Sequence, residues 1–267
     1  MIIAATMALL GGCTSPELDT GGLGDYALVW AEEFDGAAGA GPNPNNWVFD
    51  LGTGSGGWGN NELQSYKQNN ENIALDGNGN LVITARRDSS GAYTSARIRT
   101  TDKQEFHRGR FTARIRLPSG QGLWPAFWML GANYDEVGWP ACGEIDIMEM
   151  VGNMPHVVHG TVHGPGYSAG DSIGNVSSLE TGSFSDDFHV FAVDVEEDLI
   201  SWYVDGVRYG TLGPGQLPSP DLWRFDQPMF LLLNLAVGGN WPGPPDAQTE
   251  FPASMVVDYV RVYQRSE

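Results

Sequence analysis

The length, composition and charge of this chain exclude several classes of protein. It has 267 residues, of which 36 are Gly, 16 Pro and 9 Trp. An all-β fold of about 200–250 residues often remains a single domain, and the many Gly and Pro favour a chain with many turns. The formal net charge is −19 at pH 7, so long-range repulsion disfavours binding to nucleic acid or to an anionic membrane surface. The acidic residues are dispersed rather than clustered, so most of this charge serves solubility.

The first 24 residues differ in composition from the rest and are not expected to belong to the fold. Residues 1–13 are apolar or small and predict a signal peptide rather than a membrane-spanning helix. The sequence Leu10-Gly11-Gly12-Cys13 resembles a bacterial lipobox, in which the cysteine becomes a lipidated N-terminus. Residues 14–24 are rich in Thr, Ser, Pro and Gly and predict a linker. We therefore expect an exported protein with one domain over residues 25–267, either lipid-anchored through Cys13 or simply secreted.

Strand patterns recur about every ten residues through that domain and predict two packed antiparallel sheets. Asp205-Gly206, between two short apolar runs, predicts a two-residue hairpin turn. The glycines at 52, 54, 56 and 57 are not expected to lead into a helix, so they predict a loop rather than a nucleotide site. No repeat, heptad or zinc-ligand spacing is present in the sequence. The expected strands are 26–34, 73–75, 80–87, 97–100, 108–117, 123–130, 143–151, 157–163, 188–195, 199–204, 229–237 and 255–263.

One of these strands carries three carboxylates in an apolar run, Glu144-Ile145-Asp146-Ile147-Met148-Glu149. Because side chains of a strand alternate, Glu144 and Asp146 point the same way, whereas Glu149 is out of phase by one residue. If two residues between them share one place in the ladder, as in a β-bulge, Glu149 returns to the carboxylate face. Three acids on one face repel one another, so folding does not require them. A solvated polar strand face is the alternative, but the apolar opposite face favours a catalytic group.

The long side chains of the two glutamates can approach to the ~5–5.5 Å that retaining glycosidases use between nucleophile and acid/base. Asp146 would hydrogen-bond Glu144 between them. In the segment 123–130, alternation places Trp124 and Trp128 on one face and Phe127 on the other. Tryptophans in an open groove stack on the apolar faces of sugars, and the alternative is that both rings belong to the core.

The acidic motif resembles the catalytic motif of glycoside hydrolase family 16, in the bulged Glu-x-Asp-x-x-Glu form of laminarinases, which are endo-β-1,3-glucanases. Further blocks resemble the family in its own order, from about residue 25 to the end. These blocks are Trp58-Gly59-Asn60-Asn61-Glu62-Leu63-Gln64, Gly109-Arg110-Phe111, Gly122-Leu123-Trp124-Pro125-Ala126-Phe127-Trp128-Met129, His159-Gly160-Thr161-Val162-His163, Asn234-Leu235-Ala236-Val237-Gly238-Gly239-Asn240-Trp241-Pro242-Gly243 and Val257-Asp258-Tyr259-Val260-Arg261-Val262-Tyr263.

This resemblance implies an all-β fold, a concanavalin A-like β-jelly-roll sandwich whose concave sheet carries the substrate cleft. It implies retaining endo-hydrolysis of β-1,3-glucosidic bonds in a neutral β-glucan, with Glu144 as nucleophile, Glu149 as acid/base and Asp146 supporting them. We expect a monomer that needs no cofactor for catalysis. One alternative is a β-1,3-1,4-glucanase or another polysaccharide hydrolase of the family. The remote alternative, a non-catalytic β-glucan-binding module, is disfavoured because all three acids are present.

Several other side chains are candidates for binding sugar. One of them is Arg86, for which a surface salt bridge is the alternative role. In the family, a histidine at the position of His163 lies near the acids, so His163 is expected to hydrogen-bond them or the substrate. His156 and His159 are expected to be structural. The remaining candidates are Asn61, Glu62 and Arg86 as hydrogen-bonding groups, and Trp124, Trp128, Trp139 and Trp241 as stacking rings.

The resemblance also implies a structural calcium ion, away from catalysis. Glu33, the carbonyl of Gly79 and Asp258 occupy the matching positions, and oxygen ligands suit Ca²⁺. An exposed strand residue is the alternative for Asp258. The only cysteine outside the leader is Cys142, so no disulfide is expected, and we expect its side chain to pack beneath the site.

Overall fold

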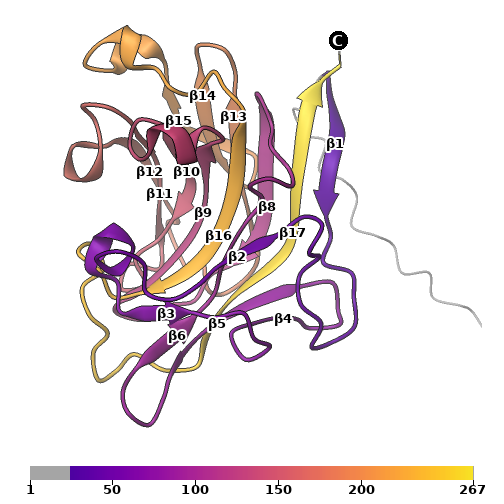
Figure 1. The fold of residues 1–267 in the computed structure, drawn as a ribbon, viewed down its shortest axis with the longest axis vertical. Helices are drawn as coiled ribbons and strands as arrows, with labels where there is room; N and C mark the ends of the chain where they lie inside the picture. Colours follow the sequence, from indigo (N-terminus) through magenta and orange to yellow (C-terminus); the bar gives the residue numbers. More distant parts are fainter. Residues whose placement is uncertain (1–24, 267) are drawn as a thin grey trace, which may run out of the picture.

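The computed structural model describes residues 25–266, which form two β-sheets packed face to face (Figure 1). The outer sheet has the order β15-β14-β13-β8-β17-β5-β6-β3, with β1 beside β17 and β4 beside β5. The concave sheet has the order β12-β11-β10-β9-β16-β7-β2. The strands are β1 (Tyr26–Glu32), β2 (Val48–Asp50), β3 (Gln64–Tyr66), β4 (Ile73–Leu75), β5 (Leu81–Arg87), β6 (Tyr93–Ser95), β7 (Arg97–Arg99), β8 (Gly109–Arg116), β9 (Leu123–Gly131), β10 (Glu144–Glu149), β11 (Val157–His163), β12 (Ile173–Ser178), β13 (His189–Val195), β14 (Ile200–Val204), β15 (Val207–Leu212), β16 (Met229–Val237) and β17 (Ala253–Arg265).

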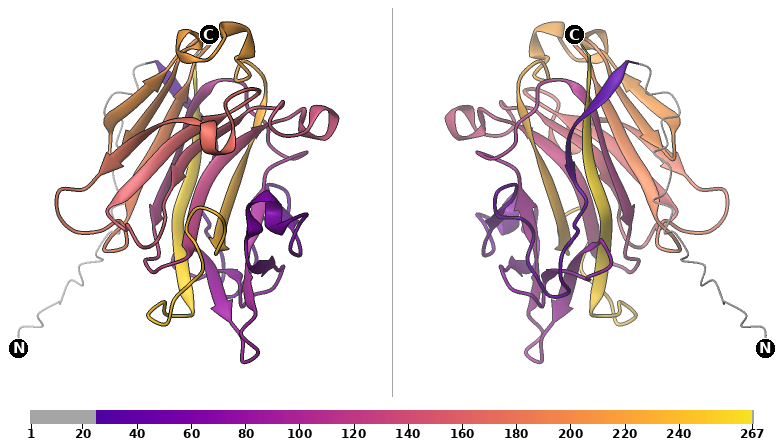
Figure 2. Two further views of the ribbon diagram at one scale, coloured as in Figure 1. Left: turned by 90° about the vertical axis from the view of Figure 1, so that its left-hand side faces the viewer. Right: turned by 90° about the vertical axis from the view of Figure 1, so that its right-hand side faces the viewer.

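The long strands of the concave sheet curve strongly, and their hollow side faces away from the outer sheet. Figure 1 shows this curvature in β9 and β16, with β8 and β17 to their right. The left panel of Figure 2 looks onto the hollow side, where the indigo segment near residues 50–61 and the salmon strands β11 and β12 stand on opposite flanks. The helices within residues 25–266 are short, and none of them is long and apolar enough to cross a bilayer.

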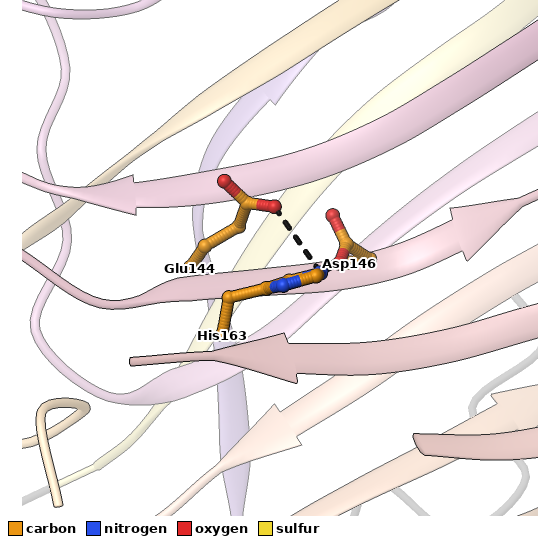
Figure 3. A group of neighbouring side chains, drawn as sticks. All are labelled: Glu144, Asp146 and His163. Carbon is orange, nitrogen blue, oxygen red and sulfur yellow. Dashed lines mark ion pairs between the residues drawn. The ribbon is translucent and has the colours of Figure 1, made fainter. Parts of the chain in front are cut away.

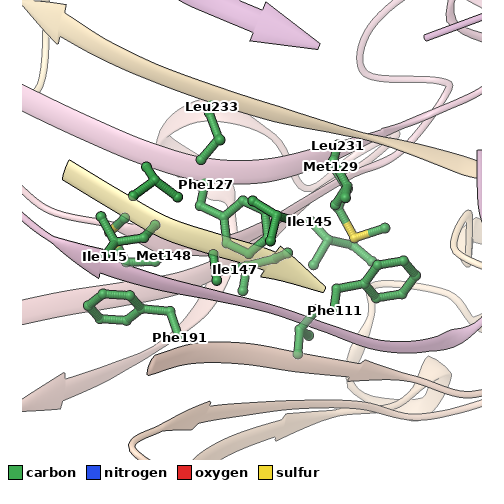
Figure 4. Close-up of a cluster of buried hydrophobic side chains, with 14 of the residues drawn as sticks. Phe111, Ile115, Phe127, Met129, Ile145, Ile147, Met148, Phe191, Leu231 and Leu233 are labelled. Carbon is green, nitrogen blue, oxygen red and sulfur yellow. The ribbon is translucent and has the colours of Figure 1, made fainter. Parts of the chain in front are cut away.

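The core lies between the sheets and follows from the two-residue alternation of the strands. Phe111 and Ile115 of β8 face Phe127 and Met129 of β9, and all four side chains are at most 1% exposed. Figure 4 shows these residues packed with side chains of β10 and β16. Because odd-numbered positions of β9 fill the core, its two tryptophans lie on the opposite, concave face. The predicted face assignment for residues 123–130 is confirmed.

A second, smaller apolar layer lies beneath the concave face. All nine residues of β16 are buried, because its odd-numbered side chains enter the main core and its even-numbered ones are covered from the hollow side. Phe230 and Leu232 pack there with Leu130 and Cys142, and Trp128 lies against them. Cys142 is a free, fully buried thiol. Its predicted place beneath the site is therefore confirmed, and no disulfide occurs among residues 25–266.

The structure departs from the sequence-based expectations at the sheet edges. Strands β2, β3, β6 and β12 were not predicted; the first three have only three residues, and β12 is a polar edge strand with alternately exposed side chains. One pair, β3 with β6, is parallel, whereas the other pairs within residues 25–266 are antiparallel. The glycines at 52–57 do lead into a helical turn, Gly57–Asn61, so the expectation that no helix follows them was wrong. This turn contains residues in the left-handed conformation, such as Trp58 with φ 54°, and a hydrophobic pattern of helical period does not predict such residues.

Candidate active site

The acidic motif forms β10, and a β-bulge interrupts its pairing with both neighbours. Against β9, Asp146 pairs with Trp128 and Glu149 with Ala126, so three steps along β10 match two steps along β9. Directly opposed side chains of antiparallel strands point to the same face, so Glu149 shares the face of Asp146. The two residues between them are 1% and 0% exposed and both lie in the core. The bulge is therefore confirmed, with two intervening side chains in the core where one was expected.

His163 lies against two of the three acids. It pairs with Glu144 across β10 and β11, and its Nε2 lies 3.5 Å from Glu144 Oε1 and 3.2 Å from Asp146 Oδ2 (Figure 3). The backbone N–H of Ala169 donates to Nδ1 of the same ring at 3.1 Å. Since Nδ1 accepts, the hydrogen of the neutral ring is on Nε2 and faces the acids. The ring and the acids are close without a hydrogen bond between them, and the buried Asp146 Oδ2 has no hydrogen-bond partner among the described residues.

The three carboxyls are protonated more readily than ordinary acids. Burial raises the pKa of Glu144, of Asp146 and of Glu149 to about 8 in each case. The negative charge of Asp146 is the next cause of the raised pKa for both glutamates, while the His163 ring opposes it. Three acids this close titrate as one cluster. Such a cluster can hold a proton on one carboxyl and a negative charge on another at neutral pH, as acid/base catalysis requires.

Aromatic rings border Glu149. The indole Nε1 of Trp124 donates to Glu149 Oε1 at 2.9 Å. Trp241 lies edge-on to Trp124, with 5.5 Å between ring centroids, and edge-on to His159 at 4.9 Å. Trp241 remains 42% exposed. His159 pairs with Glu149 across β10 and β11, so this histidine, expected to be structural, also lies beside the acid/base candidate.

An arginine between two tryptophans lies to the side of the acid-bearing strand, since the concave sheet has the order β10-β9-β16-β7. The guanidinium carbon of Arg97, on β7, lies 4.7 Å from the ring centroids of both Trp58 and Trp128. Arg97 Nε lies 2.7 Å from Asp50 Oδ2. Its positive charge lowers the pKa of Glu144, against the larger effect of burial. The same guanidinium thus makes a cation–π contact with the Trp128 ring and acts on the pKa of Glu144 through its charge.

Asn61 is the last residue of the helical turn Gly57–Asn61, and Glu62 follows it. Burial raises the pKa of Glu62, although its carboxylate accepts hydrogen bonds from Gln64 Nε2 at 2.6 Å and from the Tyr66 hydroxyl at 3.3 Å. Asn61 Nδ2 donates to Asn240 Oδ1 at 2.9 Å and so ties the turn to the loop that carries Trp241. The positive charge of Arg97 lowers the pKa of Glu62, against the larger effect of burial, so Glu62 lies within the electrostatic reach of the Arg97 stack.

Comparisons with known proteins agree with this geometry. Residues 60–261 of the chain match the sequence family described as glycosyl hydrolases family 16. The chain belongs to glycosyl hydrolase family 16. A beta-glucanase from Rhodothermus marinus is 44% identical over 248 residues, 90% of this chain and 85% of that relative. The laminarinase catalytic domain from Thermotoga maritima MSB8 superposes with a TM-score of 0.84 at 49% identity, over 91% of this chain and 100% of that one. An endo-beta-1,3-glucanase from Pyrococcus furiosus superposes with a TM-score of 0.84 at 48% identity, over 91% of this chain and 95% of that one.

The family membership confirms the predicted jelly-roll sandwich and the interpretation as a glycoside hydrolase. The site also holds residues to which the sequence analysis gave no role. Trp58 and Arg97 form the stack described above, and Asn234 accepts a hydrogen bond from Trp128 Nε1 at 2.7 Å. The alternation of β7 places Arg97 opposite the buried Ile98, so its face was predictable, but its tryptophan partners come from distant segments.

Of the two remaining predicted sugar-binding side chains, one borders the acids and the other does not. Trp139 is 45% exposed, and its ring centroid lies 6.0 Å from that of His163, so it borders the acid cluster. Arg86 is on β5 of the outer sheet, where its Nε donates to the carbonyl of Glu71 at 2.8 Å. The structure therefore does not bring Arg86 to the acids, and the expected alternative, a salt bridge, is replaced by this backbone contact.

The predicted calcium ligands do not form a good cation site. Glu33 makes two hydrogen bonds with Arg261, at 2.7 and 2.8 Å, and Asp258 accepts from Arg114 at 2.7 Å. Arginines thus already neutralise both carboxylates, which does not suit a cation. Among residues 25–266, the group with closely spaced His and carboxylate ligand atoms is that of Glu144, Asp146 and His163 in the active site. There the hydrogen on His163 Nε2 replaces the lone pair that a metal would need.

Proposed function

We propose that this protein hydrolyses internal β-1,3-glucosidic bonds of a neutral β-glucan with retention of configuration. The observation that carries the proposal is the bulged strand that places Glu144, Asp146 and Glu149 on one face. The names of the similar enzymes, a beta-glucanase and an endo-beta-1,3-glucanase, support the substrate class. The half-exposed Trp139 and Trp241 at the two ends of the acid cluster suit the stacking of sugar rings on either side of the cleaved bond.

In the first step, the Glu144 carboxylate attacks the anomeric carbon while the bond from that carbon to the glycosidic oxygen breaks. Glu149 gives its proton to the departing oxygen, which its raised pKa makes available near neutral pH. The product is a glycosyl ester on Glu144 and a released sugar chain. Asp146 lies beside the nucleophile, with carboxyl oxygens of the two residues within 4.8 Å of one another, and its charge acts on Glu144.

In the second step, water attacks the anomeric carbon and Glu149, now a carboxylate, accepts its proton. The bond to Glu144 breaks, and both acids return to their initial states. Two inversions at the same carbon give net retention. His163 Nε2–H faces Glu144 and Asp146 throughout, so it stabilises negative charge on the nucleophile side of the site.

The test compares the wild type with Glu144→Gln and Glu149→Gln on laminarin, lichenan, carboxymethyl-cellulose and agarose, following new reducing ends. We expect wild-type cleavage of laminarin with weaker cleavage of lichenan, a first-formed β-anomer by NMR, and loss of turnover in both variants. Glu250→Gln, a change at an exposed glutamate, is the matched control. Near-wild-type hydrolysis by either active-site variant would reject these roles.

Azide separates the two glutamates. In Glu149→Ala, azide can attack the glycosyl ester without a general base and yields a β-glycosyl azide; in Glu144→Ala, it replaces the nucleophile and yields the α-azide. The opposite pattern would exchange the two assignments. Cleavage of lichenan or agarose alone would keep the mechanism and change the specificity. Binding of glucans without any cleavage would favour the non-catalytic binding module.

We also propose that the protein is exported and acts as a monomer. Residues 1–24, with the signal peptide over 1–13, the lipidation candidate Cys13 and the linker over 14–24, lie outside the described residues. Mass spectrometry of the mature N-terminal peptide decides between lipidation and simple secretion. The calcium site of Glu33, Gly79 and Asp258 stays a prediction that requires Arg261 and Arg114 to release the two carboxylates. An unchanged melting temperature in EDTA would reject it.

A further inference from the structure

The carbonyl group of Asp146 lies at the point where the β10 ladder is interrupted. The register shifts after Asp146 against both β9 and β11, and a bulge leaves backbone groups unpaired. Buried carbonyls need a hydrogen-bond partner. Here the partner comes from the other sheet: the indole Nε1 of Trp202 donates to the Asp146 carbonyl oxygen at 2.9 Å, in a fully buried contact. Trp202 lies on β14 and is 0% exposed.

Space for this contact is provided by Gly160 on β11. A Cβ atom at Gly160 would lie 2.3 Å from Cδ1 of Trp202 and 2.5 Å from the hydroxyl of Tyr209. Both distances are far below contact distance, so any side chain at Gly160 would displace the indole. The backbone φ of Gly160 is not in the left-handed region, so the requirement is for room rather than for an unusual conformation.

We propose that Trp202 is a positioning residue for the general acid. Its indole N–H holds the Asp146 carbonyl and thereby the bulge that returns Glu149 to the face of Glu144. This inference rests on the proposed hydrolysis. The proposed role of Trp202 differs from simple packing, because it depends on the indole N–H as a hydrogen-bond donor and not on the volume of the ring.

The test uses Trp202→Phe, which keeps an aromatic ring and removes the donor. The control is Trp47→Phe, because Trp47 is also buried, at 2% exposure, and its Nε1 donates to Glu32 Oε2 at 3.3 Å, outside the acid cluster. Two substrates are compared: laminarin, whose alcohol leaving group needs a proton, and a dinitrophenyl β-laminaribioside, whose leaving group does not.

If Trp202 positions Glu149, Trp202→Phe lowers kcat on laminarin by at least about tenfold, since general acid catalysis contributes 10²–10⁴-fold. The rate of glycosyl-enzyme formation from the dinitrophenyl substrate stays within about threefold, because that step needs no proton. Trp47→Phe leaves the ratio of the two rates unchanged. Equal losses on both substrates, or no loss on laminarin, would overturn the proposal.

Benzothienylalanine at position 202 covers the case in which Trp202→Phe does not fold, because it has the shape of tryptophan but sulfur in place of the N–H group. The same selective loss is expected, and full laminarin activity in this protein would overturn the proposal. Failure of the proposed function is distinguishable, because the wild-type protein would then leave laminarin uncleaved in the same assay.

Discussion

The indole N–H of Trp124 donates to Oε1 of Glu149 at 2.9 Å, so the proposed general acid carries a contact that favours its ionised form. Burial and the charge of Asp146 act in the opposite direction and dominate, because the pKa of Glu149 is raised to about 8. The proton needed for catalysis is thus held by a balance of opposing contacts. Each contact can be removed separately, and the sign of each effect is defined.

Removal of the indole donor should strengthen proton binding. In Trp124→Phe, the pKa of Glu149 rises because the hydrogen bond to the carboxylate is lost. The alkaline limb of kcat/KM, which reports loss of the acid's proton, should move to higher pH by about 0.5–1 unit. A pH profile on laminarin from pH 4 to 10 measures this. An alkaline limb at lower pH than in the wild type would contradict the assignment.

Neutralisation of the middle acid should have the opposite sign. In Asp146→Asn, the negative charge that raises the pKa of Glu149 is removed, so the proton leaves at lower pH. We expect the alkaline limb to move to lower pH by about 1 unit. The position of the limb does not depend on how far kcat itself falls. Trp124→Phe and Asp146→Asn therefore serve as controls for each other, and shifts of the same sign would reject the electrostatic account.

The charge of Arg97 should affect the acid limb of the kcat/KM profile, which reports ionisation of the nucleophile Glu144. Arg97 lowers the pKa of Glu144, so Arg97→Met should raise it, and the nucleophile would ionise only at higher pH. The acid limb of kcat/KM then moves upward. Arg97→Lys keeps the charge and should leave the limb in place, while weakening the stack with Trp58 and Trp128 and raising KM. A limb that moves equally in both variants would point to the stack rather than to the charge.

The raised pKa of Glu149 also predicts how stability depends on pH. A carboxyl whose pKa is about 8 when folded and near 4.5 when unfolded stabilises the fold below the lower value, and this stabilisation is lost as the pH rises through the higher one. In Glu149→Gln the side chain does not ionise, so the variant does not lose this contribution to stability as the pH rises. Urea unfolding should show the variant about as stable as the wild type at pH 4 and more stable by at least about 1 kcal/mol at pH 9. Glu250→Gln is the control, and equal stability at pH 9 would show that Glu149 is not destabilised by burial.

The tautomer of His163 is open to direct measurement. Because the Ala169 N–H donates to Nδ1, nitrogen-15 NMR should show the hydrogen of the neutral ring on Nε2. His163→Gln, whose amide nitrogen can replace Nε2, should retain more activity than His163→Asn, whose shorter side chain cannot reach the acids. A neutral ring protonated on Nδ1 would contradict the structure.

The sequence was sufficient for the features that depend on local alternation. The faces of β9, the bulge in β10 and the burial of Cys142 all follow from parity or composition and are confirmed. The contacts of Arg97, Trp58 and Asn234 were not predictable, because their partners lie far away in the chain and meet only through the sheet order. The helical turn Gly57–Asn61 was missed for a different reason, since left-handed residues such as Trp58 and Asn61 have no hydrophobic pattern.

The bulge in β10 determines how the catalytic strand responds to the deletion of one residue. Loss of one residue from a strand normally turns every later side chain to the opposite face. Between Asp146 and Glu149, two residues fill one place in the ladder, so deletion of Ile147 would leave a regular strand in which Glu144, Asp146 and Glu149 still alternate correctly. This part of the catalytic strand can therefore lose one residue and keep its three acids on one face.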